Sequence, residues 1–285
     1  MSIQAAMLPD GKRLHLQHGP IDLIIEANGR ADQVAKAYSA ARLRFATVLD
    51  RLADELPALR SLVPEKGLAV TGPIARRMEA VVRPFWQLKV TPMAAVAGSV
   101  ADEMLEAMCA GAALSRAYVN NGGDIALHLG DGETFSIASA NGPVAVNTTD
   151  PVRGIATSGW RGRSFSFGIA DSVTVLAATA AQADIAATLI ANEVDLPRSI
   201  KVRRAPAAAL YPDSDLGQRR VTVEVADLTD AEVSAALSRG LDFAGRLQAR
   251  GLIVAATLGL NNEVRTLEAA PAEAAPAMTE IRQHA

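Results

Sequence analysis

The spacing of hydrophobic and polar positions predicts helices in the first third of the chain. From residue 31 to about residue 62, apolar side chains recur at helical spacing with charges on the opposite side, which predicts one long amphipathic helix. Shorter helices are predicted over residues 74–82 and 92–110, each begun or ended near a proline. Before them, apolar-rich runs at 13–17 and 21–27 flank a His-Gly-Pro turn, which predicts a β-hairpin.

The middle third has the pattern of short strands. Four apolar-rich runs, separated by Gly-Gly, Gly-Asp-Gly and Asn-Gly turns, lie at residues 117–121, 124–129, 134–140 and 143–147. Polar and aromatic residues alternate at 164–167, and a Val-rich run at 172–178 leads directly into an Ala-rich helix, so we expect a second sheet pairing packed against that helix. A strand at 220–225 and an amphipathic helix at 230–251 follow.

The composition indicates a folded protein with a core of small side chains. The 285 residues are 49% hydrophobic and only 4% aromatic, so Ala, Val, Leu and Ile must fill the interior by close packing. We expect one α+β domain over residues 1–267. Residues 268–285 are rich in Ala, Pro and Glu, a composition typical of a disordered tail.

Charge and apolar runs exclude several classes of partner. The formal net charge is −3 with both signs interspersed, so the basic surface that nucleic-acid binding needs is absent. The most apolar stretch, residues 90–113, is interrupted by a proline and acidic residues, and the first residues lack the features of a secretory signal. We therefore expect a cytoplasmic protein with no membrane contact. Cys109, the single cysteine, is interpreted as a buried apolar thiol.

The Ala-rich helix carries the first candidate for a metal site. Thr179 and Gln182 form a capping box that fixes the helix start and places Asp184 in the second turn, where capping of its own helix does not explain it. Thr188 lies four residues later on the same face, so a carboxylate and a hydroxyl are stacked one turn apart. Together with a backbone carbonyl they suit Mg2+. The alternative is a solvent-facing Asp beside a Thr that bonds its own helix.

Three further segments are weaker signals when each is taken alone. Residues 120–124, Asn-Asn-Gly-Gly-Asp, lie between two predicted strands, where glycine lets a backbone approach a ligand or simply forms a hairpin turn. Thr-Ser-Gly at 157–159 is a short polar element. Residues 94–102 form a small-residue helix that is typical of close helix packing, and Asp102 at its end needs a partner if it is buried.

Taken in order, these segments resemble the ApbE superfamily of flavin transferases. Its members carry a Gly-x-x-x-Asp helix, an Asn-x-Gly-Gly-Asp loop, a Thr-Ser-Gly element, and a Ser-Val-Thr-Val strand running into Ala-Asp-x-x-x-Thr; the matching residues here are 98–102, 120–124, 157–159, 172–175 and 183–188. Over its whole length the chain looks closer still to an ApbE-like family, UPF0280, through His-Gly-Pro-Ile-Asp-Leu from residue 18, the glycine loop, and the segment 164–175.

The resemblance implies a fold and a site. The fold would be α+β, ApbE-like and related to the T-fold, with mixed sheets packed against long helices. Flavin would lie across a sheet with Mg2+ bridging its pyrophosphate, for transfer of FMN from FAD to a protein threonine or for FAD hydrolysis. By matching position, the metal ligands would be Asp184, Thr188 and the carbonyl near Ala94, and the cofactor-binding residues would be Asn120, Gly122, Gly123, Asp124, Ser158, Gly98 and Asp102.

Two departures from the family pattern bear on activity. Ala97 stands where many ApbE proteins have a lysine able to face phosphate. The His-Ile-x-Asp-Pro segment expected before the Ser-Val-Thr-Val strand is absent, with Phe165, Phe167 and Gly168 in that region. Two hypotheses therefore stay open: an Mg2+-dependent enzyme acting on FAD or a related nucleotide, and a non-catalytic cofactor binder or accessory protein in cofactor biosynthesis. The expected partner is a small-molecule cofactor, and assembly into a homo-oligomer stays open.

Overall fold

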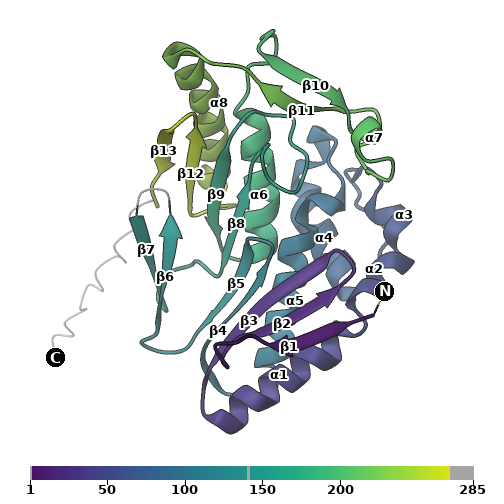
Figure 1. The fold of residues 1–285 in the computed structure, drawn as a ribbon, viewed down its shortest axis with the longest axis vertical. Coiled ribbons are helices and arrows are strands. Elements are labelled where there is room, and N and C mark those ends of the chain that lie inside the picture. The colour runs from purple at the N-terminus through teal and green to yellow at the C-terminus, as the bar shows by residue number, and fades with distance from the viewer. Residues whose placement is uncertain (1, 140–141, 270–285) are drawn as a thin grey trace, which may run out of the picture.

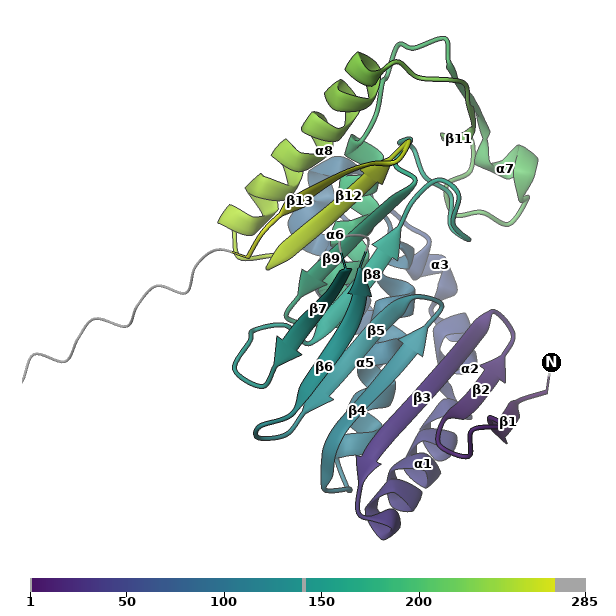
Figure 2. The same cartoon turned by 60° about the vertical axis from the view of Figure 1, so that its left-hand side comes forward.

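A large antiparallel sheet with helices on one face dominates the computed structural model, which describes residues 2–139 and 142–269 (Figures 1 and 2). Within these residues the strands run in the order β1 (Gln4–Met7), β2 (Leu14–His18), β3 (Ile21–Gly29), β4 (Leu114–Asn121), β5 (Asp124–Leu129), β8 (Gly154–Ser158), β9 (Ser172–Ala177), β12 (Ala255–Leu260) and β13 (Glu263–Leu267). The predicted α+β fold class is confirmed.

Helices cover one face of this sheet, and a hairpin lies on the other. The helical layer comprises α1 (Ala31–Phe45), α2 (Val48–Asp54), α3 (Leu56–Leu59), α4 (Pro73–Val82), α5 (Val96–Cys109), α6 (Ala180–Glu193) and α8 (Asp230–Ala249), with 3-10 turns η1 (Arg83–Leu88) and η2 (Pro92–Ala95). The hairpin of β6 (Thr134–Ser139) and β7 (Gly142–Asn147) lies against the opposite face (Figure 2). A second hairpin is formed by β10 (Val202–Pro206) and β11 (Arg220–Val225), with α7 (Ala207–Leu210) between them in the chain. These three elements lie at the upper end of the molecule in Figure 1.

The sheet and its helices repeat one arrangement twice along the chain. In the first half, the hairpin β2–β3 is followed by α1 and α5 and then by the hairpin β4–β5. In the second half, β8–β9 is followed by α6 and α8 and then by β12–β13. The two halves join where β5 meets β8, and this seam is narrow: Ile125 pairs with Ile155 and Ala126 with Gly154.

Alternation and small side chains explain how these layers pack. Strands β3, β9 and β12 alternate buried and partly exposed residues, as expected when one face meets helices. Helix α6 is buried on most sides and consists largely of Ala, so its neighbours approach closely. At Gly98 a Cβ atom would lie 2.3 Å from the carbonyl oxygen of Ala180, so only glycine permits this contact between α5 and α6.

Cys109 is half-buried, and burial raises the pKa of its thiol to about 11, in line with an inert thiol.

The single long helix predicted for residues 31–62 is wrong. The structure divides it into α1, α2 and α3. After Phe45 the amide of Thr47 donates to the carbonyl of Arg44, three residues back, and the helix ends. Pro57 occupies the first turn of α3, where its missing N–H costs nothing. An amphipathic pattern continues through such breaks because each short helix still turns its apolar side to the same core.

The expectation of sheet pairing at residues 164–167 is also wrong, whereas β9 and α6 are confirmed. Residues 164–167 form a loop held by the side chain of Asn192, whose oxygen accepts from the amide of Phe167 at 2.8 Å and from the hydroxyl of Ser166 at 3.1 Å. The pairing is made instead by β8, a strand of small residues. Residues 270–285, most of the predicted tail, lie outside the described residues. None of the described helices is long and apolar enough to cross a membrane.

Candidate functional site

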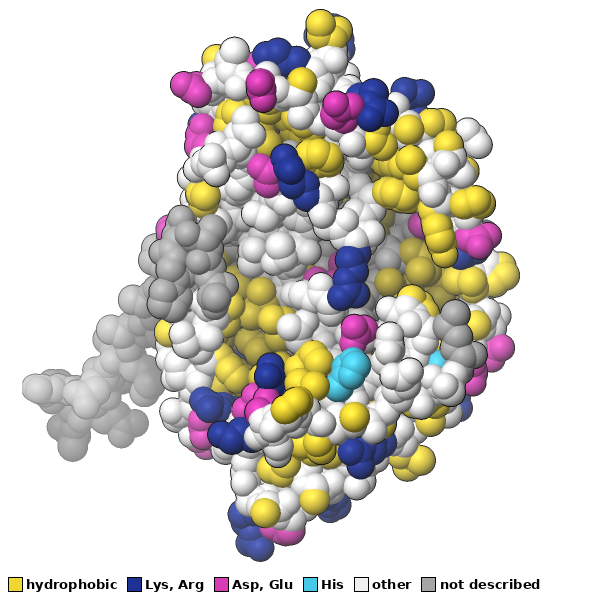
Figure 3. Space-filling model, viewed as in Figure 1, with side chains coloured by type: hydrophobic (Ala, Val, Ile, Leu, Met, Phe, Trp, Pro, Cys, Tyr) yellow, Lys and Arg dark blue, Asp and Glu magenta, His cyan; other side chains and the backbone are white. Residues whose placement is uncertain are grey.

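Two adjoining cavities lie beside the start of β5, at one end of the seam between the halves. The larger has a volume of about 880 Å³ and the smaller about 610 Å³. Asp124, Asp184 and Thr188 line both, so these three side chains mark the junction of the cavities. In the space-filling view, hydrophobic side chains gather at the upper right, over α7 and the adjoining α3 region (Figure 3).

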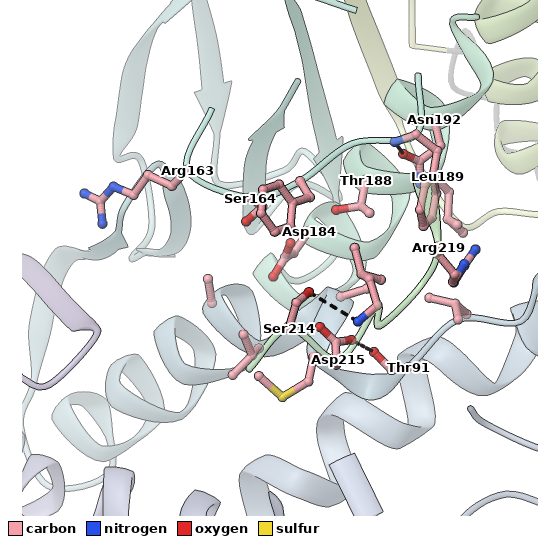
Figure 4. A pocket seen from close by; sticks show the side chains of 18 of the residues that line it. Thr91, Arg163, Ser164, Asp184, Thr188, Leu189, Asn192, Ser214, Asp215 and Arg219 are labelled. Atoms are coloured by element: carbon pink, nitrogen blue, oxygen red, sulfur yellow. Dashed lines mark hydrogen bonds between the residues drawn. The ribbon is translucent and has the colours of Figure 1, made fainter. Parts of the chain in front are cut away.

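The two cavities have different walls. The smaller is bounded by the turn between β2 and β3, the end of β8, and apolar side chains from α2, α3 and α5, namely Leu49, Leu52, Leu56, Leu59 and Val100. The larger lies between η2, α6 and the segment that joins α7 to β11, and its wall is more polar. There the hydroxyl of Thr91 donates to Asp215 at 2.5 Å, which ties this segment to the start of η2 (Figure 4).

Helix α6 presents its predicted carboxylate and hydroxyl to this junction. Asp184 and Thr188 lie one turn apart on the helix and point towards the same space (Figure 4). One oxygen of Asp184 accepts a hydrogen bond from the amide of Gly98 at 2.9 Å, in the first turn of α5. Asp184 therefore caps a neighbouring helix rather than its own, and a carboxylate there is stabilised by the helix dipole. The alternative of a solvent-facing Asp184 does not hold.

Asp102 makes the reciprocal contact. Its two carboxylate oxygens accept from the amides of Ala180 and Ala181, at 3.0 and 2.9 Å, at the start of α6. Helices α5 and α6 thus each receive a carboxylate from the other at their N-terminal ends. These two amides are the partners that a buried carboxylate at position 102 was expected to need. These contacts fix the position of Asp184 beside the cavities, because they lock the two helix starts together.

Burial and mutual repulsion perturb the two carboxyl groups at the junction. Loss of solvent raises the pKa of Asp124 to about 7, although the nearby amide of Thr157 opposes this. Burial also raises the pKa of Asp184 well above its usual range, and the charge of Asp124 raises it further, against the amides of Gly98 and Ala97. Two carboxylates that repel each other inside a cleft form a site that a cation would stabilise.

The donor set fits a hard cation rather than a soft metal. Across residues 2–139 and 142–269, no three His, Cys, Asp or Glu side chains gather as a metal cluster. Two carboxylates and a hydroxyl, completed by backbone carbonyls and water, are what Mg2+ accepts. Ala94, the predicted carbonyl ligand, lines the larger cavity together with Asp184 and Thr188.

The glycine loop is built as its sequence indicates, but only part of it reaches the cavities. Gly122 and Gly123 have φ of 66° and 117°, a region that favours glycine, and the side chain of Asn120 accepts from the amide of Gly123 at 2.8 Å. Gly122 and Ser158 line the smaller cavity. The other predicted cofactor-binding residues, which line neither cavity, are Asn120, Gly123, Gly98 and Asp102. Their role in binding stays a prediction.

Comparison with known proteins agrees with the sequence motifs. The family described as AbpE bacteria matches residues 5–266. The chain belongs to this family. A UPF0280 protein of Methanopyrus kandleri is 33% identical over 177 residues, 60% of this chain and 69% of that protein. One of Methanothrix thermoacetophila is 37% identical over 135 residues, 45% of this chain and 55% of that protein. The chain therefore spans between about half and about two thirds of these relatives, and the predicted UPF0280 membership is confirmed.

A solved structure of the flavin transferase ApbE from Vibrio cholerae, in a mutant form, also aligns with the chain. The TM-score is 0.48 at 11% sequence identity, covering 94% of this chain and 97% of that one.

In this member of the AbpE family, the structure also places residues at the cavities that the sequence analysis did not identify. Arg60 and Arg163 line both cavities, although 103 positions separate them in the sequence. Arg219 stacks on the ring of Phe167 at 4.1 Å in the larger cavity, and the carboxylate of Asp215 lies nearby on the same segment. None of the three arginines belongs to a motif, so only the tertiary structure brings them to these cavities.

Proposed function

We propose that this protein binds FAD, or a closely related flavin dinucleotide, together with Mg2+, and places the ligand's pyrophosphate at the junction of the two cavities. One observation supports this most strongly: the carboxylates of Asp124 and Asp184 and the hydroxyl of Thr188 lie where two largely apolar cavities join. A dinucleotide has the same order of parts, with an anionic centre between an aromatic ring system and a nucleoside. Family membership supports the choice of a flavin.

The metal would be held by the chain's own oxygen atoms. Asp184 and Thr188 are the side-chain ligands we propose, with Asp124 facing them and the carbonyl near Ala94 completing the set. When bound, Mg2+ supplies neutralisation of the charge that develops on a reacting phosphate. Without it, the pyrophosphate would meet two carboxylates and be repelled. We therefore expect flavin binding to depend on metal.

Each cavity suits a different part of the ligand. Leu49, Leu52 and Leu56 give the smaller cavity an apolar wall that suits the flavin ring. In the larger cavity, the side chain of Asn192 and the stacked pair of Phe167 and Arg219 offer polar and planar contacts that suit a nucleoside. The flavin ring and the nucleoside would both be bound before any reaction. The pyrophosphate between them would therefore be held in a fixed orientation.

The reaction we propose is cleavage of the pyrophosphate. An acceptor oxygen, from water or a protein threonine, bonds to the phosphorus of the FMN half, and the bond to the bridging oxygen breaks with release of AMP. No histidine among the described residues lines either cavity, and Ala97 supplies no cation. A histidine that would take the acceptor's proton is therefore missing from the described cavity walls. We expect slow cleavage and poor transfer to protein, which also keeps open the second candidate, a cofactor binder or accessory protein without catalysis.

Incubation with FAD and Mg2+ tests this function. AMP release and covalent flavin on a threonine-containing peptide are followed over time, with Asp184→Asn as the control. We expect Mg2+-dependent flavin binding, little covalent flavin, and loss of binding and of any AMP release in Asp184→Asn. Rapid flavinylation that the substitution abolishes would contradict the expectation of poor transfer. Flavin binding unaffected by the substitution would contradict the metal site.

A further inference from the structure

Two arginines face the cleft without a partner. Arg60 follows α3, and Arg163 lies in the loop between β8 and β9. Both are exposed, and both line the larger and the smaller cavity. In the described part of the chain, neither guanidinium makes a hydrogen bond, an ion pair or a ring contact.

Two other arginines, one near Arg163 in the chain and one in the larger cavity, are engaged. Arg161 pairs with Asp171 at 2.9 Å, and Arg219 donates to the carbonyl of Lys89 at 2.9 Å. These cations are neutralised or bonded by the protein itself. Arg60 and Arg163 have no such partner, although they line the same two cavities as Asp124 and Asp184.

The position of Arg163 gives a reason for Gly122. A Cβ atom at Gly122 would lie 3.3 Å from a terminal nitrogen of Arg163, so the guanidinium rests on the bare backbone of the glycine loop. In this position the side chain extends away from Asp184 and Thr188 (Figure 4). Donors of a guanidinium held over a glycine turn remain available to a ligand in the cavity.

The charge balance at the junction indicates the kind of ligand. The ionisable side chains that line both cavities are Arg60 and Arg163 on one side and Asp124 and Asp184 on the other. With both carboxylates ionised these charges cancel, and a bound divalent cation leaves a surplus of two positive charges. A pyrophosphate diester carries the matching two negative charges.

We propose that Arg60 and Arg163 are the phosphate-binding side chains of this chain, which hold the pyrophosphate of the ligand from two walls of the cleft. They supply the cationic contact that Ala97 cannot make. Each guanidinium offers several N–H donors to phosphate oxygens, and such charge-assisted bonds are stronger than neutral ones. The identity of the ligand as a flavin rests on the proposed function above, whereas the arginine–phosphate contact does not.

Binding measurements on single variants test this proposal. Arg163→Gln and Arg60→Gln are compared with Arg198→Gln, which removes an exposed arginine that lines neither cavity. Calorimetric titrations use FAD, riboflavin and inorganic pyrophosphate, each with Mg2+. We expect each cleft variant to bind FAD and pyrophosphate about tenfold more weakly or worse, the range of one lost charge-assisted hydrogen bond. Riboflavin, which has no phosphate, should bind all proteins equally, and Arg198→Gln should match wild type.

The outcomes separate this proposal from the proposed function. If wild type binds FAD and the cleft variants bind it as tightly, or lose FAD and riboflavin affinity equally, the arginines are not phosphate-binding. If wild type binds pyrophosphate through the arginines but no flavin, the proposed function fails and the arginine assignment stands. If wild type binds neither FAD nor pyrophosphate, the arginine assignment is wrong.

Discussion

Replacing Asp124 by Asn should stabilise the metal-free protein at neutral and alkaline pH. Burial raises the pKa of Asp124 to about 7, so the folded protein prefers the protonated form. In the unfolded chain the pKa of this carboxyl is 3.8. Its contribution to the unfolding free energy is therefore fully present below about pH 4 and is lost as the pH rises through the folded pKa of about 7. Asn does not ionise, so the variant does not incur this loss.

The size of the effect follows from the two pKa values. A change from 3.8 to about 7 corresponds to about 4 kcal/mol of unfolding free energy above pH 8, at 1.36 kcal/mol per pKa unit. Asp124 keeps some solvent contact, which screens part of this, so we expect about 2 to 4 kcal/mol. A bound Mg2+ relieves the same cost in wild type, because it favours the ionised carboxylate.

Urea unfolding between pH 5 and 9, with and without Mg2+, measures this. Without metal, wild type should lose stability relative to Asp124→Asn as the pH rises, and Mg2+ should restore wild type more than the variant. Asp227→Asn, at an exposed position outside both cavities, is the control and should follow wild type. Parallel stability profiles for wild type and Asp124→Asn across this pH range would refute the reasoning.

Three further predictions concern the helices that position the site. Gly98→Ala should destabilise the fold by about 2 kcal/mol or more in thermal unfolding, because its Cβ would lie 2.3 Å from Ala180, whereas Gly245→Ala in α8 meets nothing within 4 Å and should be neutral or slightly stabilising. Asp102→Ala should cost about 2 kcal/mol in urea unfolding through loss of the cap on α6, and an unchanged midpoint would contradict the capping role. Cys109 should react slowly with iodoacetamide at pH 8, and alkylation as fast as that of a free thiol would show that its half-buried position does not raise the pKa of the thiol.

The sequence predicted those features that depend on local pattern. The capped helix that carries Asp184 and Thr188, and the glycine turn at Gly122, follow from spacing and turn chemistry alone. The end of α1 near Thr47 could not be predicted in this way, because the apolar pattern continues through the short helices that follow. Nor could the strand at 154–158, because a run of small residues carries little alternation.

The site required tertiary information for a different reason. The hydrogen bond from Gly98 to Asp184 joins helices that begin 84 residues apart, and no motif records it. Arg60 and Arg163 lie in loops, at positions where no sequence motif predicts a binding site. Their common cleft is lined by segments from both halves of the chain, a property of the tertiary structure and not of any one segment.

In the proposed function, Asp184 binds a metal ion that in turn binds the flavin's pyrophosphate. Flavin fluorescence titration of the protein with FAD, in the presence of either Mg2+ or EDTA, tests it most directly, with Asp184→Asn measured alongside. We expect wild type to bind FAD with Mg2+ at least about tenfold more tightly than in EDTA, a difference of about 1.4 kcal/mol, and the variant to show no such dependence. Tight FAD binding in EDTA, or no binding by wild type with Mg2+, would contradict it.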